Sequence, residues 1–373
     1  MGSQGTQARG LATAAAPSIP SPQPRLAHAP VPGFPSAFPS EAISLAATAA
    51  APGGAPPPLR VLVLPGNPGA AAFYTPFLAR LHERLGGRAD VVALSLHGHD
   101  AGLGLEAGAG WAHPPRKRGA GVRNLAPVTG LDGQVAHAVA AAAALAATGS
   151  VCGSGGGGPA PVALVGHSIG ALIALRAAAA LDAGGERGST AAVVALMPYL
   201  AFNAAAPQQR ALKLLTRRPG RAAAAAAAAG LAALPGRVQG AILRAATGPA
   251  DRGLAPHAAG AVLAFLGAGG TRHALGLAAT EFKQLSAPAF TPEWGLLARL
   301  GSRGAAFYAD GDHWCPVECG VAGLGAAAAA APDAKIRLLD NQRHDFPVCE
   351  ARSASAADAV AAVLLEMVVL EKQ

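Results

Sequence analysis

The chain has 373 residues, enough for one large α/β domain with insertions, and 51% of them are hydrophobic although only 4% are aromatic. The formal net charge is +8, but basic residues do not alternate with aromatic ones and no zinc-ligand spacing occurs, so nucleic-acid binding is not predicted. No apolar run reaches the roughly 18 residues of a membrane-spanning helix. The positive charge instead favours an anionic membrane or lipid-droplet surface as a peripheral partner.

The N-terminal residues 1–57 are rich in Pro, Ala and Ser and hold two arginines and one acid. Such a segment buries too little apolar area to fold, so we expect a disordered tail. The scarcity of acids also fits an organelle transit peptide, which would direct the protein to a plastid. Residues 1–6, MGSQGT, fit the pattern for N-myristoylation as well.

From residue 59 onward, short apolar runs alternate with helix-forming segments. Strands are predicted at residues 59–64, 90–95, 162–165, 191–197, 305–308 and 335–339. Helices are predicted at residues 73–85, 131–147, 171–181 and 356–371. This alternation is typical of a parallel sheet with helices on both faces, so we expect a single α/β domain over residues 58–373.

Residues 199–302 form an insertion between the fourth and fifth predicted strands. From residue 210 to residue 244 there are seven basic residues and no acid, with leucines among them. One interpretation is a solvated helical cap on the sheet. The other is a helical lid that lies on a lipid surface, with its basic residues toward phosphate and its leucines toward acyl chains.

Residues 166–170 read Gly-His-Ser-Ile-Gly and lie between a predicted strand and a predicted helix. That succession is the nucleophile elbow of the α/β-hydrolase fold, with Ser168 as the nucleophile. Gly166 and Gly170 are expected because a Cβ at either place would collide with the neighbouring strand or helix. The five-residue pattern alone is weak in a chain with 48 glycines, and the flanking elements make it specific.

The nucleophile needs a base within hydrogen-bond reach and an acid that orients the base. In this fold the chain order is Ser, then Asp or Glu, then His. His344 is the only histidine after the last predicted strand and is the predicted base. Asp310 and Asp312 both follow the strand at 305–308, and Asp312, in the loop that turns back, is the preferred acid. The chemistry requires no metal and no organic cofactor.

An oxyanion hole needs two backbone N–H groups directed at the tetrahedral intermediate. One is expected from Ile169, the residue after the nucleophile. The other is expected from Asn67, in the turn Pro-Gly-Asn-Pro-Gly that follows the first predicted strand. Gly66 allows a close approach there, whereas Pro68 has no N–H to donate.

Several of these segments together resemble the lipid-droplet-associated hydrolases, a branch of the α/β-hydrolases. The segments are LPGNPG at 64–69 with Phe73 and Tyr74, GHSIGA at 166–171, DHWCP at 312–316, and HDF at 344–346. The resemblance covers residues 59–373 and implies Ser168, Asp312 and His344 as nucleophile, acid and base. It implies an ester hydrolase that acts on lipids at lipid-droplet or endoplasmic reticulum surfaces, with sterol esters as proposed substrates. The alanine-rich insertion departs from the family.

The leading hypothesis is therefore a serine hydrolase of lipid carboxylic esters. One alternative is a lipid acyltransferase, in which a lipid alcohol takes the place of the water that releases the acyl group. The other is a scaffold protein that binds lipid droplets with weak or no catalysis. In that case the basic insertion would be the functional part.

Overall fold

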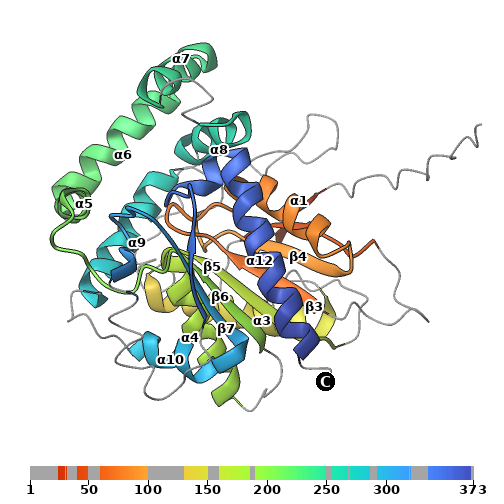
Figure 1. Cartoon of the computed structure of the whole chain (residues 1–373). Coiled ribbons are helices and arrows are strands. Elements are labelled where there is room, and N and C mark those ends of the chain that lie inside the picture. Colours follow the sequence, from red (N-terminus) through yellow and green to blue (C-terminus); the bar gives the residue numbers. More distant parts are fainter. Residues whose placement is uncertain are drawn as a thin grey trace, which may run out of the picture.

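An eight-stranded sheet forms the centre of the protein, with the strand order β1-β2-β4-β3-β5-β6-β7-β8 (Figure 1). The computed structural model describes residues 24–29, 31, 40–48, 59–99, 130–149, 159–184, 190–247, 254–267, 269–285, 292–318, 320 and 335–370. The strands are β1 (Arg25–Ala29), β2 (Ser40–Leu45), β3 (Leu59–Leu64), β4 (Ala89–Leu94), β5 (Val162–His167), β6 (Thr190–Leu196), β7 (Gly304–Ala309) and β8 (Lys335–Leu339). Six neighbouring strands, β4, β3, β5, β6, β7 and β8, run parallel to one another. This arrangement confirms the predicted α/β-hydrolase fold.

Helices cover both faces of this sheet. On one face, α1 (Thr75–Arg84) packs against α12 (Glu350–Leu370) (Figure 1). On the other face, α4 (Ile169–Ala183) packs between α3 (Leu131–Thr148) and α10 (Pro292–Leu300). Because both faces are covered, the central strands are buried along their whole length and are apolar almost throughout. The short 3₁₀ helices are η2 (Ala71–Tyr74), η3 (Gly301–Arg303) and η4 (Phe346–Val348).

The expectation of a disordered tail over residues 1–57 is wrong for residues 24–29 and 40–48. There β2 pairs antiparallel with β4 and extends the sheet, and β1 pairs antiparallel with β2. Composition argues against a segment that must build its own core, but β2 instead buries Ala42, Ile43 and Leu45 on a sheet that already exists. The transit peptide was predicted for the tail of residues 1–57 and the myristoylation pattern for residues 1–6, and residues 1–23 lie outside the described residues.

Most of the described residues between β6 and β7 are helical. The helices are α5 (Pro207–Leu215), α6 (Arg218–Ala232), α7 (Gly236–Thr247), α8 (Pro256–Gly267) and α9 (Gly270–Gln284), followed by α10. The predicted insertion is too long, because α10 contacts α4 and β7 and so belongs to the layers of the domain. We call residues 207–247 the α5–α7 segment, which extends along one end of the molecule (Figure 1). Among the described helices, none has the length and hydropathy that crossing a bilayer requires.

Candidate active site

Ser168 lies at the tip of β5, where the strand turns into α4. Its φ angle is 54°, a value that costs a non-glycine residue on the order of 1–3 kcal/mol. The turn is held by close packing: a Cβ on Gly166 would overlap the carbonyl oxygen of Gly170, and a Cβ on Gly170 would overlap that of Leu64. Only glycine fits at these two positions, as the sequence predicted. The packing around the turn holds Ser168 in its strained backbone conformation.

The imidazole of His344 connects the side chains of Ser168 and Asp312. Nδ1 of His344 donates to Oδ2 of Asp312 at 2.8 Å, and Oγ of Ser168 donates to Nε2 at 2.9 Å. The three residues come from the loops after β8, β7 and β5, which end at the same edge of the parallel sheet. The structure thus brings together the three residues that the sequence selected.

Asp312 is a buried carboxylate with several donors. Oδ1 accepts from the backbone N–H groups of Trp314 at 2.8 Å and Cys315 at 3.2 Å, while Oδ2 accepts from His344. Burial opposes ionisation, but the hydrogen bond and charge of His344 and the two backbone donors outweigh it, so the pKa of Asp312 is lowered. The aspartate therefore remains charged at neutral pH, as a group that orients an imidazole must.

The alternative acid, Asp310, is exposed, whereas Asp312 is only 6% exposed. Asp312, Cys315 and His344 also offer three possible metal ligands within 4.8 Å of one another. Their geometry is that of hydrogen bonds, because Nδ1 of His344 points at the carboxylate and Sγ of Cys315 donates to the carbonyl oxygen of Met197. We therefore interpret this group as a proton-transfer site.

The turn after β3, residues 65–69, contains Asn67, from which the second oxyanion donor is expected, and we call it the oxyanion turn. The N–H of Gly66 donates to the hydroxyl of Tyr74 at 2.9 Å, and that of Gly69 donates to the carbonyl oxygen of Gly66 at 2.6 Å. Pro68 has no N–H, and the N–H of Asn67 remains the donor expected from this turn. Ile169 begins α4, so its N–H is one of those that a helix leaves without an internal partner.

Sequence reasoning missed the role of Tyr74 and His167 in this site. The Tyr74 hydroxyl accepts from Gly66 and donates to Nδ1 of His167 at 2.6 Å. The ring of His167 lies 5.1 Å from that of His344, and a Cβ on Gly66 would lie 2.9 Å from Nδ1 of His167. Burial, and secondarily the proximity of His344, holds the pKa of His167 well below its usual value. A neutral histidine thus connects the oxyanion turn to the region of the base.

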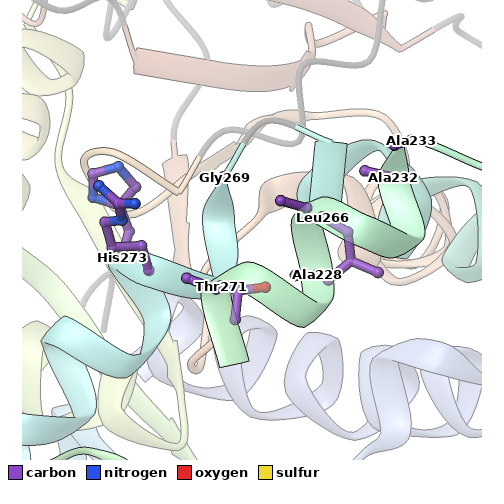
Figure 2. Close-up of a pocket in the computed structure, with 10 residues that line it drawn as sticks. Ala228, Ala232, Ala233, Leu266, Gly269, Thr271 and His273 are labelled. Carbon is purple, nitrogen blue, oxygen red and sulfur yellow. The ribbon is translucent and has the colours of Figure 1, made fainter. Parts of the chain in front are cut away.

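A cavity of about 470 Å³ lies between α6 and the turn that joins α8 to α9. Figure 2 shows His273 at one end of it and Ala232 and Ala233 at the other. The ring of His273 lies 6.2 Å from that of His99, whose Nδ1 donates to the carbonyl oxygen of Pro68 at 2.7 Å. His273 thus connects the cavity wall to a histidine that binds the oxyanion turn, but neither Ser168 nor a residue of that turn is among the residues that line the cavity.

Solved structures with the same fold cover almost the whole chain. DBJA matches with a TM-score of 0.57 at 16% identity, over 92% of this chain and 97% of that chain. A variant of the haloalkane dehalogenase DatA from Agrobacterium tumefaciens gives 0.55 at 14% identity, over 92% and 97%. A thermophilic esterase from Thermogutta terrifontis gives 0.50 at 14% identity, over 92% and 99%. At these identities the likeness shows the fold alone. No protein with a curated description matches the sequence.

A family model described as lipid-droplet associated hydrolase matches residues 57–347. That span contains the turn after β3, the nucleophile elbow and the loops that carry Asp312 and His344. It also covers more than half of the chain, so the match concerns the domain as a whole. The chain belongs to the lipid-droplet associated hydrolase family.

Proposed function

We propose that this hydrolase cleaves lipid carboxylic esters with Ser168 as nucleophile, His344 as general base and Asp312 as the acid that orients the base. The observation that carries the proposal is the pair of hydrogen bonds made by His344, 2.9 Å to Ser168 and 2.8 Å to Asp312. This arrangement supports nucleophilic catalysis because Nε2 of His344 can accept the hydroxyl proton of Ser168, while the charge of Asp312 stabilises the imidazole that has gained it.

In the first half of the proposed reaction, Oγ of Ser168 attacks the ester carbonyl carbon while Nε2 of His344 takes the hydroxyl proton. The carbonyl oxygen becomes an oxyanion, which the N–H groups of Asn67 and Ile169 stabilise. The protonated imidazole gives its proton to the departing alcohol as the carbon–oxygen bond breaks, and an acyl-enzyme remains. Water then attacks this ester by the same route and releases the fatty acid and Ser168.

A lipid substrate is supported by the family and by the helices over the site. The cavity beside α6 has alanines and Leu266 on part of its wall, which an acyl chain could contact, and Thr271, Arg272 and His273 on the rest, which polar atoms of an ester could contact (Figure 2). Removing apolar area from water stabilises the bound substrate by about 25 cal/mol per Å². Sterol esters are the substrates we propose.

We further propose that the α5–α7 segment places the enzyme on the surface of a lipid droplet or of the endoplasmic reticulum. Five of the seven exposed large hydrophobic side chains among the described residues lie there: Leu214, Leu215, Leu234, Val238 and Ile242. The segment also holds seven basic residues and no acid. Exposed apolar side chains beside basic ones are typical of helices that lie in the interface of an anionic lipid layer.

Turnover by the purified full-length chain tests the proposed function. Wild type should release fatty acid both from a short soluble ester and from emulsified cholesteryl ester, and Ser168→Ala should reduce both rates by at least about 10⁴-fold. Ser44→Ala, on β2, is the matched control and should retain both rates. If folded Ser168→Ala hydrolysed esters at the wild-type rate, the proposal would be wrong.

The same assay separates the alternatives. An acyltransferase would move the acyl group to an added lipid alcohol and release less fatty acid as the alcohol concentration rises. A scaffold would bind droplets equally well as wild type or as Ser168→Ala and would show no Ser168-dependent turnover with either substrate.

A further inference from the structure

A second acid lies beside the oxyanion turn, in a place that the proposed mechanism does not use. Glu281 belongs to α9, and its side chain is 4% exposed. Its Oε1 accepts a hydrogen bond from Nδ2 of Asn67 at 3.2 Å. The same Nδ2 donates to the backbone carbonyl of Ala274, also in α9, at 2.9 Å. One helix of the insertion thus holds the side chain of Asn67 at two points.

In the part of the chain that the structure describes, Glu281 lacks the ion pair that another buried glutamate, Glu293, makes. Glu293, on α10, pairs with Nε of Arg176 at 2.7 Å. Among the described residues, no basic side chain lies within ion-pair distance of Glu281. Burial therefore raises the pKa of Glu281 to about 8, against the smaller opposing effect of the hydrogen bond from Asn67. The carboxyl group is therefore mostly neutral at pH 7 and ionises as the pH rises through about 8.

The surroundings of Glu281 contain few groups that could compensate its charge. Glu281 acts on the phenol of Tyr199, whose pKa is raised by its burial first and by Glu281 second. The helices packed against α9 carry these charged or titratable groups: Asp132 and His137 (α3), Arg210 and Lys213 (α5), Arg218 and Arg221 (α6), and His257 (α8). Asp132 accepts from Gln284, Lys213 lies over the Phe202 ring, and His257 donates to the Pro347 carbonyl. The helix α9 itself carries Arg272, His273 and Lys283. None of these shifts the pKa of Glu281.

We propose that Glu281 is a positioning residue that fixes Asn67 while it is neutral and weakens the oxyanion hole once it is ionised. The inference rests on the proposed serine-hydrolase function, and it adds a second titrating acid to that site. Glu281 accepts from the side chain of Asn67, the residue whose backbone N–H we propose as an oxyanion donor.

The expected pH dependence follows from the sign of the charges. The tetrahedral intermediate places a negative charge at the Asn67 N–H, and a carboxylate bound to the Asn67 side chain repels it across a region from which water is excluded. Below about pH 8 the neutral acid exerts no such repulsion. Activity should therefore fall as pH rises through about 8, through kcat more than through KM, because the repulsion is strongest when the oxyanion forms.

The test compares pH profiles of kcat and KM on a short soluble ester between pH 6 and pH 9.5, corrected for spontaneous hydrolysis. Wild type should lose on the order of tenfold in kcat above pH 8. Glu281→Gln keeps an oxygen that accepts from Asn67 but cannot ionise. This variant should remain active, and its kcat should not fall above pH 8. Glu281→Ala removes the support of Asn67 and should lower kcat on the order of tenfold at every pH.

Glu293→Gln is the matched control, because it replaces an equally buried glutamate away from Asn67. It should keep the wild-type alkaline limb even if its ion pair with Arg176 is lost. An alkaline limb in Glu281→Gln identical to that of wild type would overturn the inference, and this comparison stands even if Glu281→Ala does not fold. The proposed function has a separate readout: covalent labelling of Ser168 by a fluorophosphonate shows whether the hydrolase proposal stands whichever profile is found.

Discussion

The loops around Ser168 and the α5–α7 segment are built in different ways. At the elbow, strands and helix are buried and backbone atoms approach so closely that only glycine fits at positions 166 and 170. In the α5–α7 segment, all of which the structure describes, α7 buries no residue and α6 buries Ala228 alone. Close packing determines the conformation of the loops around Ser168, whereas the α5–α7 segment exposes basic side chains and leucines to solvent. Changes in the first should affect folding and chemistry, and changes in the second should affect binding to surfaces.

The largest effect is expected from the acid that orients His344. Asp312→Asn keeps the shape of the side chain but removes the charge, and kcat should fall on the order of 10⁴-fold. Asp310→Asn, two residues earlier and exposed, should leave kcat unchanged. Steady-state kinetics on a soluble ester measure both. A loss in Asp310→Asn with full activity in Asp312→Asn would assign the acid to the other aspartate.

A pair of glycine substitutions contrasts the packing of the two regions directly. A Cβ on Gly170 would overlap the backbone of Leu64 and Pro65, so Gly170→Ala should cost about 3 kcal/mol or more of unfolding free energy. A Cβ on Gly230, in α6, would meet no other atom within 4 Å, and Gly230→Ala should stabilise by about 0.5–1 kcal/mol. Urea denaturation gives both values, and equal effects at the two positions would contradict the comparison.

Glu281 should make stability depend on pH. An ordinary glutamate ionises near pH 4.5, whereas burial raises the pKa of Glu281 to about 8. Between these values the folded chain keeps a proton that the unfolded chain releases, so this group reduces stability as pH rises. Glu281→Gln should therefore be more stable than wild type near pH 7, on the order of 3 kcal/mol, with a much smaller difference at pH 5. Urea titrations at both pH values test this, and a difference independent of pH would contradict it.

A smaller effect is expected from charge reversal on α5 and the turn after it. Lys213 and Arg217 are exposed and line a basic groove of about 790 Å³ between α5 and α9. Since each basic residue near an anionic lipid surface contributes about 1 kcal/mol, Lys213→Glu with Arg217→Glu should weaken binding to phosphatidylserine-containing vesicles by at least about 30-fold. Vesicle flotation measures this, with Arg299→Glu on α10 as the control. Equal flotation of the double variant and wild type would refute surface binding through this groove.

The six parallel strands and the helices that cover them follow from local pattern, since each is a short apolar or helix-forming run. The elbow was also predictable, because Gly166 and Gly170 are required by local sterics. The strand β2 was not predictable, because its apolar residues are few and it forms only by pairing with the edge of β4. The contact of Glu281 with Asn67 was not predictable either, because the two residues are 214 positions apart and no nearby residue indicates the contact.

Covalent labelling of Ser168 tests the central claim most directly. The purified chain is incubated with a fluorophosphonate probe, with and without added lipid droplets, and the adduct is located by peptide mass spectrometry. The hydrogen bond between Ser168 and His344 predicts stoichiometric labelling of Ser168 in wild type and none in Ser168→Ala. Folded wild type that stays unlabelled under both conditions, or that is labelled at another residue, would contradict the assignment of Ser168 as an activated nucleophile.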